Sequence, residues 1–492
     1  MRLAEHSVGA STAPTDSSPT GRPGFRDRPR RAAGEPSPCF LEPRSDRLEP
    51  FSNGLLRRAP GLRVLALLVL LSVAAPVAAA ELPVVREQLE NGFTLLVREN
   101  PTAPVVAMSL MVKMGTRWET ADKAGISNFV QAVIVRGTTK RSGGEIAETI
   151  ARLGGKLSAS GEVDYSEIKG TALARFWREL LGLVTELALH PSLTPEYVDS
   201  ERDFLLPRIQ KREDNPTTRG FDVLFAQLFG SHPYGLPVLG TPESIERLNH
   251  EAILSWYRQF YRPDRMVLAV SGQVPAAQVV AEAKRSFGSL PKSGGDSKDA
   301  PLPRPTPSGG RTLVEQEAQQ VQILVGSLGP RLEDRDYAAV KVLSTILGGG
   351  LAGRLFVELR DKQALAYTVS AYFDPLREAG AQIVYLGTAP DNAARAEAAL
   401  LKQIERIRAE AVGAAELRRA KAYLLGTMEM DRRTNARQAW YLAFYEIEGA
   451  GYDFPARYRR AVEAVTAADV LRVAKAYLEP LTTVVLRPPA KP

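Results

Sequence analysis

The amino-acid sequence predicts an α+β protein made of two homologous domains, each an antiparallel-rich sheet with helices packed on it, joined by a Pro/Gly-rich linker. Three observations support this prediction. The chain has 492 residues, of which 44% are hydrophobic and 24% charged, an ordinary globular composition with more length than one core requires. Strand-like and helical patterns alternate along the chain. Residues 245–267 also match residues 462–484 at a constant offset, as expected after a duplication.

The first 80 residues are predicted to serve export rather than folding. Residues 1–56 are rich in Pro, Arg, Ser and Gly and show no helical or strand period, which indicates a disordered extension, or an untranslated one if synthesis starts near Leu55. Residues 57–80 join two arginines to a short apolar run and end on small residues, the three parts of a secretory signal peptide. We expect cleavage near Ala80 and a mature chain that is soluble in the periplasm or outside the cell. The alternative is an uncleaved anchor, although the run is shorter than the roughly 20 residues that span a bilayer.

Charge and cysteine content exclude several classes of function. Lys and Arg number 63 and Asp and Glu 56, but residues 1–80 carry a net charge of +4 and leave only +3 on the rest of the chain. A protein that binds nucleic acid needs a concentrated basic surface, so we expect no nucleic-acid partner. The single cysteine is Cys39, which excludes disulfides, cysteine-ligated zinc and thiol catalysis from the main body of the chain.

Residues 81–291 form the first predicted domain. Asn91-Gly92, flanked by the strand-like segments Arg86–Leu89 and Phe93–Arg98, predicts a β-hairpin, and Val105–Val112 predicts a third strand. The remaining elements follow from hydrophobic period and from helix start and stop signals. We expect helices near 122–136, 144–153, 175–189, 195–213 and 250–261, and strand-like segments at Lys156–Leu173 and Met266–Ser271.

Residues 292–310 have the Gly, Pro and Ser content of a linker, and residues 311–492 form the second predicted domain. A helix, a proline and a strand recur in it with an offset of 217 residues. The matching positions are Ile245, Leu254, Phe260, Pro263 and Val267 with Val462, Leu471, Tyr477, Pro480 and Val484. Chance similarity between two amphipathic helices is the alternative. An offset that stays constant through helix, proline and strand favours duplication.

Several motifs follow one another in a fixed order along both halves. They are Gly125–Ala132, Arg136–Ser142, Arg152–Ala159, Ser231–Gly235 and Tyr261–Asp264 in the first half, and Leu347–Gly350 with Arg354–Phe356 in the second. Their order and spacing resemble the pitrilysin/insulinase family of zinc peptidases, the inverzincins. The resemblance covers roughly residues 82–487.

The resemblance also implies that the zinc site of the family is lost. In the family, one helix carries His-x-x-Glu-His, whose two imidazoles bind Zn²⁺ and whose Glu is the general base, and a second Glu about 75 residues later completes the metal shell. The corresponding positions here hold Asn128, Gln131, Ala132 and Arg208. Amides are weak zinc ligands and cannot act as bases, Ala has no donor atom, and Arg brings a permanent cation. We therefore expect no catalytic residue, metal or other cofactor in this chain.

The other histidines of the main body offer no replacement site. His190, His232 and His250 lie far apart in the sequence and lack ligand spacing, so we expect exposed or structural roles for them. His232 belongs to a turn-like His-Pro-Tyr-Gly motif and is expected to be a packing residue.

The second half keeps a pair that the resemblance associates with substrate binding. In the family, an Arg-x₆-Tyr pair holds the substrate carbonyl next to the scissile bond, and Arg360 and Tyr367 stand at that spacing. A fixed cation and a hydroxyl donor are suited to stabilise an oxyanion. Ala364 occupies a position where the family usually has Gly, a departure that could shift the turn between them. The alternative is a solvated arginine and an ordinary strand tyrosine.

Peptide binding in the family resembles strand addition to a sheet edge, and the matching segment is Gly155–Gly161. The alternative is that Leu157 and Ala159 simply alternate into the core, and the sequence favours neither interpretation.

These features predict a non-catalytic subunit of a two-chain zinc peptidase. A homologous sister chain would bring the zinc and its ligands, and this chain would bring Arg360, Tyr367 and half of the chamber for unfolded or short peptides. The alternative from another class is a peptide-binding or structural scaffold protein with no part in proteolysis.

Overall fold

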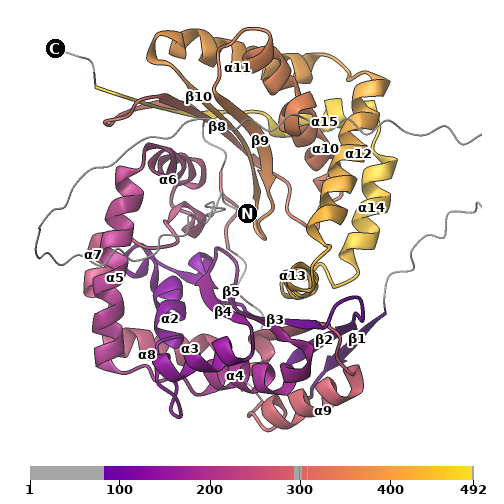
Figure 1. Cartoon of the computed structure of the whole chain (residues 1–492). Coiled ribbons are helices and arrows are strands. Elements are labelled where there is room, and N and C mark those ends of the chain that lie inside the picture. Colours follow the sequence, from indigo (N-terminus) through magenta and orange to yellow (C-terminus); the bar gives the residue numbers. More distant parts are fainter. Residues whose placement is uncertain (1–82, 293–298, 300–301, 307–308, 490–492) are drawn as a thin grey trace, which may run out of the picture. The chain divides into compact units, whose positions relative to one another are not determined.

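The computed structural model describes residues 83–292, 299, 302–306 and 309–489. The predicted extension, the predicted signal peptide and most of the predicted linker lie outside these residues. None of the described helices combines the length and the apolar character needed to cross a bilayer. Two mixed sheets with helices packed against them make up the described part of the chain (Figure 1).

The first sheet has six strands in the order β1-β2-β6-β3-β5-β4. They are β1 (Val84–Gln88), β2 (Thr94–Glu99), β3 (Val105–Val112), β4 (Lys156–Gly161), β5 (Ser166–Leu173) and β6 (Met266–Gly272). Only β2 and β6 pair in parallel; every other neighbouring pair in this sheet is antiparallel. The predicted strand-like segment 156–173 is therefore two strands, because the chain turns between Gly161 and Ser166 and pairs β4 with β5.

The second sheet repeats this topology. Its order is β7-β11-β8-β10-β9, formed by β7 (Gly310–Glu315), β8 (Val321–Gly329), β9 (Thr368–Asp374), β10 (Gly380–Thr388) and β11 (Thr482–Arg487). Again one pair, β7 with β11, is parallel and the others are antiparallel. Without β1 the two sheets match strand for strand, and β6 corresponds to β11 as the constant sequence offset predicts.

The helices fall into two corresponding sets. The first half contains α2 (Ile126–Ile134), α3 (Gly143–Arg152), α4 (Trp177–Leu189), α5 (Pro195–Asp214), α6 (Pro216–Phe229), α7 (Pro242–Arg247), α8 (His250–Phe260) and α9 (Ala276–Phe287). The second contains α10 (Tyr337–Gly348), α11 (Ala393–Ala409), α12 (Ala414–Asp431), α13 (Asn435–Ile447), α14 (Phe454–Ala464) and α15 (Ala467–Tyr477). Among the helices of the first half, α6, α7 and α9 were not predicted from the sequence.

Each half lends one helix to the sheet of the other. Helix α13 packs on β3 and β6, and α6 packs on β8 and β11 (Figure 1). Leu96 and Met111 of the first sheet accordingly share a hydrophobic core with Leu442 of α13. On the other side, Leu224 of α6 shares a core with Leu324 of β8. The two halves therefore bury apolar surface against each other rather than standing as independent units.

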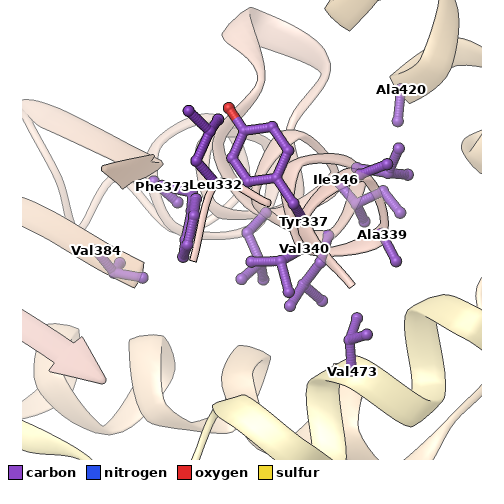
Figure 2. Packing of buried hydrophobic residues seen from close by; sticks show 14 of the residues in the cluster. Leu332, Tyr337, Ala339, Val340, Ile346, Phe373, Val384, Ala420 and Val473 are labelled. Atoms are coloured by element: carbon purple, nitrogen blue, oxygen red, sulfur yellow. The ribbon is translucent and has the colours of Figure 1, made fainter. Parts of the chain in front are cut away.

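Helix α10 lies at the centre of the second half. Its side chains point in several directions (Figure 2), and nine of its twelve residues are buried. The labelled neighbours come from the sheet (Phe373 and Val384), from α12 (Ala420) and from α15 (Val473). A helix that is apolar on all sides has to be covered on all sides, and α10 is enclosed by β9, α12, α14 and α15.

Candidate functional site

A cavity of about 730 Å³ opens in the first half between α2, α5, β4 and the start of α3. Asn128 and Ala132 line it from α2, Arg208 from α5, and Ala159 and Ser160 from β4. Three of the four positions that the sequence aligned with the family's zinc site thus meet at one cavity. The fourth, Gln131, does not line it.

Helix α2 has a defined start that fixes which side chains reach the cavity. The helix begins after Gly125, whose φ of +86° favours glycine, and the Glu119 carboxylate accepts N–H bonds from Gly125 (2.8 Å) and Ser127 (2.9 Å). Residues at i and i+4 lie on one face of a helix, so Asn128 and Ala132 face the cavity together. Burial of Glu119 raises its pKa to about 7, against the opposing effect of these two hydrogen bonds.

Gln131 is fully buried. Its Nε2 donates a hydrogen bond to the Tyr261 hydroxyl at 2.6 Å, while its Oε1 has no hydrogen-bond partner among the described residues. The hydrogen bond to Tyr261 holds Gln131 in the core. Because a side-chain amide has no proton-accepting nitrogen and no carboxylate, Gln131 cannot act as a general base.

Helix α5 supplies two charged residues to the cavity, Glu201 and Arg208. They lie seven residues apart, two turns along one face of the helix. Glu201 is buried and forms an ion pair with Arg136, whose guanidinium also lies 4.7 Å from the Phe204 ring centroid. Burial raises the pKa of Glu201, and the hydrogen bond from Arg136 opposes that rise.

The Arg136–Glu201 pair was not predicted from the sequence as part of the site. The seven-residue spacing between Glu201 and Arg208 on one predicted helix was an available signal for Glu201. Pairing with Arg136, 65 residues away in sequence, depends on tertiary contact.

The donor atoms around the cavity do not fit the zinc ion that the family implies. Asn128 offers a weakly ligating amide, Ala132 none, and the Glu201 carboxylate is already neutralised by Arg136. Arg208 adds a positive charge. Within the described residues no group of three or more His, Cys, Asp or Glu side chains is arranged to hold a metal ion. The expectation that the chain carries no metal stays a prediction.

The three histidines considered in the sequence analysis lie at separate places. His190 follows α4, His250 begins α8, and neither lines the cavity. His232 is buried, and its Nδ1 accepts the Tyr234 N–H at 3.2 Å. Its ring packs against those of Phe229 and Tyr234, and burial lowers the pKa of the imidazole.

Strand β4, the centre of the predicted peptide-pairing segment, is an edge strand. It pairs with β5 on one side only within the described part of the chain. Leu157 and Ala159 are partly buried against the hydrophobic core of the first half. This is the packing role that the sequence offered as the alternative to peptide binding. Ala159 and Ser160 also line the cavity, so the strand edge and the cavity are continuous.

Arg360 and Tyr367 lie in the second half and do not line the cavity. Arg360 belongs to a short π-helical segment, η7 (Phe356–Asp361), is exposed, and has its guanidinium 5.0 Å from the Phe356 ring centroid. Tyr367 stands just before edge strand β9, and 57% of it is exposed. Ala364, between them, has a φ of +51°, the left-handed conformation that glycine favours. Both side chains therefore project into solvent from the two sides of one tight turn.

Comparison with known proteins covers both halves. A family model described as "Insulinase (Peptidase family M16)" matches residues 94–242, and one described as "Peptidase M16 inactive domain" matches residues 247–424. An uncharacterized zinc protease of Mycobacterium leprae (strain TN) is 32% identical over 356 residues, which cover 71% of this chain and 79% of that protein. An uncharacterized zinc protease of Rickettsia bellii (strain RML369-C) is 26% identical over 388 residues, or 79% and 93% of the two chains.

Solved structures show the same fold. A crystal structure of a peptidase M16 inactive domain from Pseudomonas fluorescens matches with a TM-score of 0.77 and 22% identity, covering 84% of this chain and 100% of that one. A protease from Helicobacter pylori matches equally well, with a TM-score of 0.77, 22% identity and coverage of 82% and 100%. The predicted α+β fold of two homologous domains is thereby confirmed.

Proposed function

The chain belongs to peptidase family M16, the insulinase family, and from this premise we propose that it is the non-catalytic subunit of a two-chain zinc peptidase. Its partner would be a homologous chain that retains His-x-x-Glu-His and binds the zinc. This chain would contribute one half of the peptide chamber together with Arg360 and Tyr367.

One observation carries the proposal: the positions aligned with the metal ligands meet at a single cavity without the atoms that would bind a metal. Asn128, Ala132 and Arg208 line that cavity, so the absence of ligands concerns the side chains and not the shape of the site. A chain that lost the whole site through drift would have no reason to keep the cavity open. A chain that works beside an active homologue retains its fold and its peptide-binding surfaces.

The second half supports a role in holding substrate. The Arg360 guanidinium offers a planar set of N–H donors and the Tyr367 hydroxyl is a further hydrogen-bond donor. Because both are exposed, both are free to approach a carbonyl oxygen of a peptide held between the two chains. Stabilising negative charge on such an oxygen lowers the barrier to peptide hydrolysis. The zinc and the general base would come from the partner.

Export belongs to the same proposal. If the signal peptide is cleaved near Ala80, the complex would act on unfolded or short peptides in the periplasm or outside the cell. N-terminal sequencing of the secreted chain tests the cleavage site, and a first residue close to Glu81 is expected.

The decisive experiment measures cleavage of a quenched, unstructured peptide by the chain alone, by its zinc-motif homologue alone, and by the mixture. We expect the mixture to exceed the sum of the two separate rates. Arg360→Ala and Tyr367→Phe should each reduce the rate of the mixture about 10- to 1,000-fold. Arg335→Ala is a matched control, because this arginine is also exposed and in the second half but lies outside the Arg-Tyr turn.

No stimulation and no co-elution with a zinc-motif homologue would overturn the proposal. The remaining function would then be that of a peptide-binding or structural scaffold protein.

A further inference from the structure

We propose that the cavity lined by Asn128, Ala132 and Arg208 binds the carboxylate group of a peptide, with the Arg208 guanidinium as its partner. This inference rests on the proposed function, since it specifies which peptides this chain holds. The carboxylate belongs either to the C-terminus of the peptide or to an Asp or Glu side chain.

The charges around the cavity favour an anion. Glu201 is the acidic residue that lines it, and the ion pair with Arg136 neutralises that carboxylate. Arg208 attracts the Glu201 carboxylate through space but makes no hydrogen bond and no ion pair with the described residues, so its N–H groups are available to a ligand. A guanidinium presents two parallel N–H groups, the geometry that a carboxylate accepts in a bidentate pair.

Neutral donors stand around the same cavity. The half-buried Asn128 amide and the exposed Ser200 hydroxyl both line it. Each supplies an N–H or O–H donor for a second carboxylate lone pair. At the start of α3, Glu145 already accepts the Ser142 N–H at 2.8 Å.

Strand β4 explains why the anion would belong to a peptide. Its outer edge, which pairs with no other strand among the described residues, offers main-chain N–H and C=O groups to an extended chain, and Ala159 and Ser160 of this strand line the cavity. A peptide that extends the sheet along β4 would therefore bring a terminal carboxylate or an acidic side chain next to Arg208. Main-chain pairing would supply affinity, and Arg208 would supply the preference for acidic peptides.

The experiment uses the full chain and four fluorescein-labelled nine-residue peptides of one Val/Thr/Ser-rich sequence. The first has a free C-terminal carboxylate, the second is amidated, and the third and fourth are amidated with Glu or Gln at the central position. Fluorescence anisotropy gives each dissociation constant. We expect the free acid, or the Glu peptide, to bind about fivefold more tightly than its neutral counterpart, as an exposed ion pair of about 1 kcal/mol gives. Which of the two is preferred identifies the source of the carboxylate.

Two variants test whether Arg208 causes the preference for the peptide that carries a carboxylate. Arg208→Gln should abolish it and leave binding of the neutral peptides unchanged. Lys211→Gln is the matched control, since Lys211 is an exposed cation on the same helix that does not line the cavity. It should retain the full preference. The preference should also shrink as salt is raised from 50 mM to 500 mM.

The outcomes separate the two proposals. Equal binding of acidic and neutral peptides by the unchanged chain, or a preference that survives Arg208→Gln, overturns the carboxylate site while peptide binding stands. Failure of all four peptides to bind, both to the chain alone and to its mixture with the zinc-bearing homologue, overturns the carboxylate site together with the peptide-holding role.

Discussion

At the residue scale, Ala364 carries a backbone conformation that costs free energy. Its φ of +51° is the one positive value among the described non-glycine residues, and an L-residue pays about 1–2 kcal/mol there. We expect Ala364→Gly to stabilise the chain by up to about 1 kcal/mol, because relief of strain exceeds the added entropy of the unfolded chain. Urea unfolding measures the change.

A second alanine provides the control for that experiment. Ala422 is exposed in the interior of α12, so Ala422→Gly should destabilise the chain by about 1 kcal/mol. Destabilisation by both substitutions would show that the turn between Arg360 and Tyr367 does not need a left-handed residue. The turn that contains Ala364 would then differ in conformation from the turn in which the family has glycine.

Glu119 predicts a pH dependence of stability. Its folded-state pKa of about 7 exceeds the ordinary 4.5, because desolvation opposes its charged form. The folded state thus holds more protons than the unfolded state between pH 4.5 and 7, so stability falls as pH rises through this window. The loss amounts to as much as about 3 kcal/mol. Urea unfolding at pH 5 and pH 8 should show a fall in the unchanged chain and a fall smaller by up to this amount in Glu119→Gln. The remainder comes from Glu167, Glu201 and Glu448, whose pKa values burial also raises.

Glu145→Gln serves as the reference for that slope. Hydrogen bonds from Ser142 lower the pKa of this exposed carboxyl, so its proton is lost below the tested range. The Glu145→Gln variant should keep the slope of the unchanged chain. An equal slope in Glu119→Gln would assign the pH dependence to other groups.

The sequence predicted part of the candidate site at this scale. Asn128, Ala132 and Arg208 were found through the resemblance to the family, whose zinc motif has a known position along the chain. Neither the Gln131–Tyr261 hydrogen bond nor the Arg136–Glu201 ion pair was predicted, since each joins residues more than 60 positions apart. Which long-range partner a polar side chain meets follows from packing and not from periodicity.

At the element scale, α2 and α5 hold the three cavity positions in fixed places, which can be tested by rebuilding a metal site. The variant Asn128→His/Ala132→His/Arg208→Glu would present two imidazoles at i and i+4 and a carboxylate opposite them. We expect it to retain about one Zn²⁺ per chain after dialysis, measured by elemental analysis. The unchanged chain should retain much less.

The matched control for zinc binding omits one ligand. Asn128→His/Arg208→Glu keeps Ala132, and two ligands should bind zinc far more weakly than three. If the triple variant folds and yet retains no more zinc than this control, positions 128, 132 and 208 do not converge as the cavity indicates.

Helix α6 was not predicted, although its buried residues follow a helical period. Gly220, Phe221, Leu224 and Leu228 face one side, which is sufficient to predict a helix. Its packing on the second sheet is a long-range property, so the sequence does not reveal it. Leu224 is fully buried against that sheet. It lies so close to Gly326 of β8 that a Cβ added at this glycine would be 3.2 Å from the Leu224 Cδ1 atom.

Truncation of this side chain tests the contact. Leu224→Ala should destabilise the chain by about 2–5 kcal/mol, because it leaves a cavity where helix and sheet meet. Chemical denaturation measures the loss. A change below about 1 kcal/mol would show that α6 does not depend on the second sheet.

At the scale of the whole molecule, the constant offset of 217 residues predicted the duplication, and the matching strand orders agree with it. A sequence offset reports common origin and not contact between the copies. The exchange of α6 and α13 could not be predicted, because nothing in the local pattern of either helix identifies the sheet that it covers. The polar contacts between the halves could not be predicted from the sequence either. Arg117 of the first half pairs with Glu378 of the second, and Asp164 accepts the Arg377 N–H at 3.1 Å.

This exchange predicts that the halves fold only together. Residues 81–291 expressed alone would leave the face of β2, β3 and β6 that α13 covers exposed to water, including Leu96, Ala107 and Met111. We expect that fragment to aggregate or to bind a hydrophobic dye, and co-expression with residues 309–492 to give a soluble complex. A full chain cut at a protease site placed within residues 293–298 should still elute as one particle with a single unfolding transition. A first half that folds alone with the melting temperature of the full chain would show that α13 contributes little to its core, contrary to the buried contacts that join the two sheets.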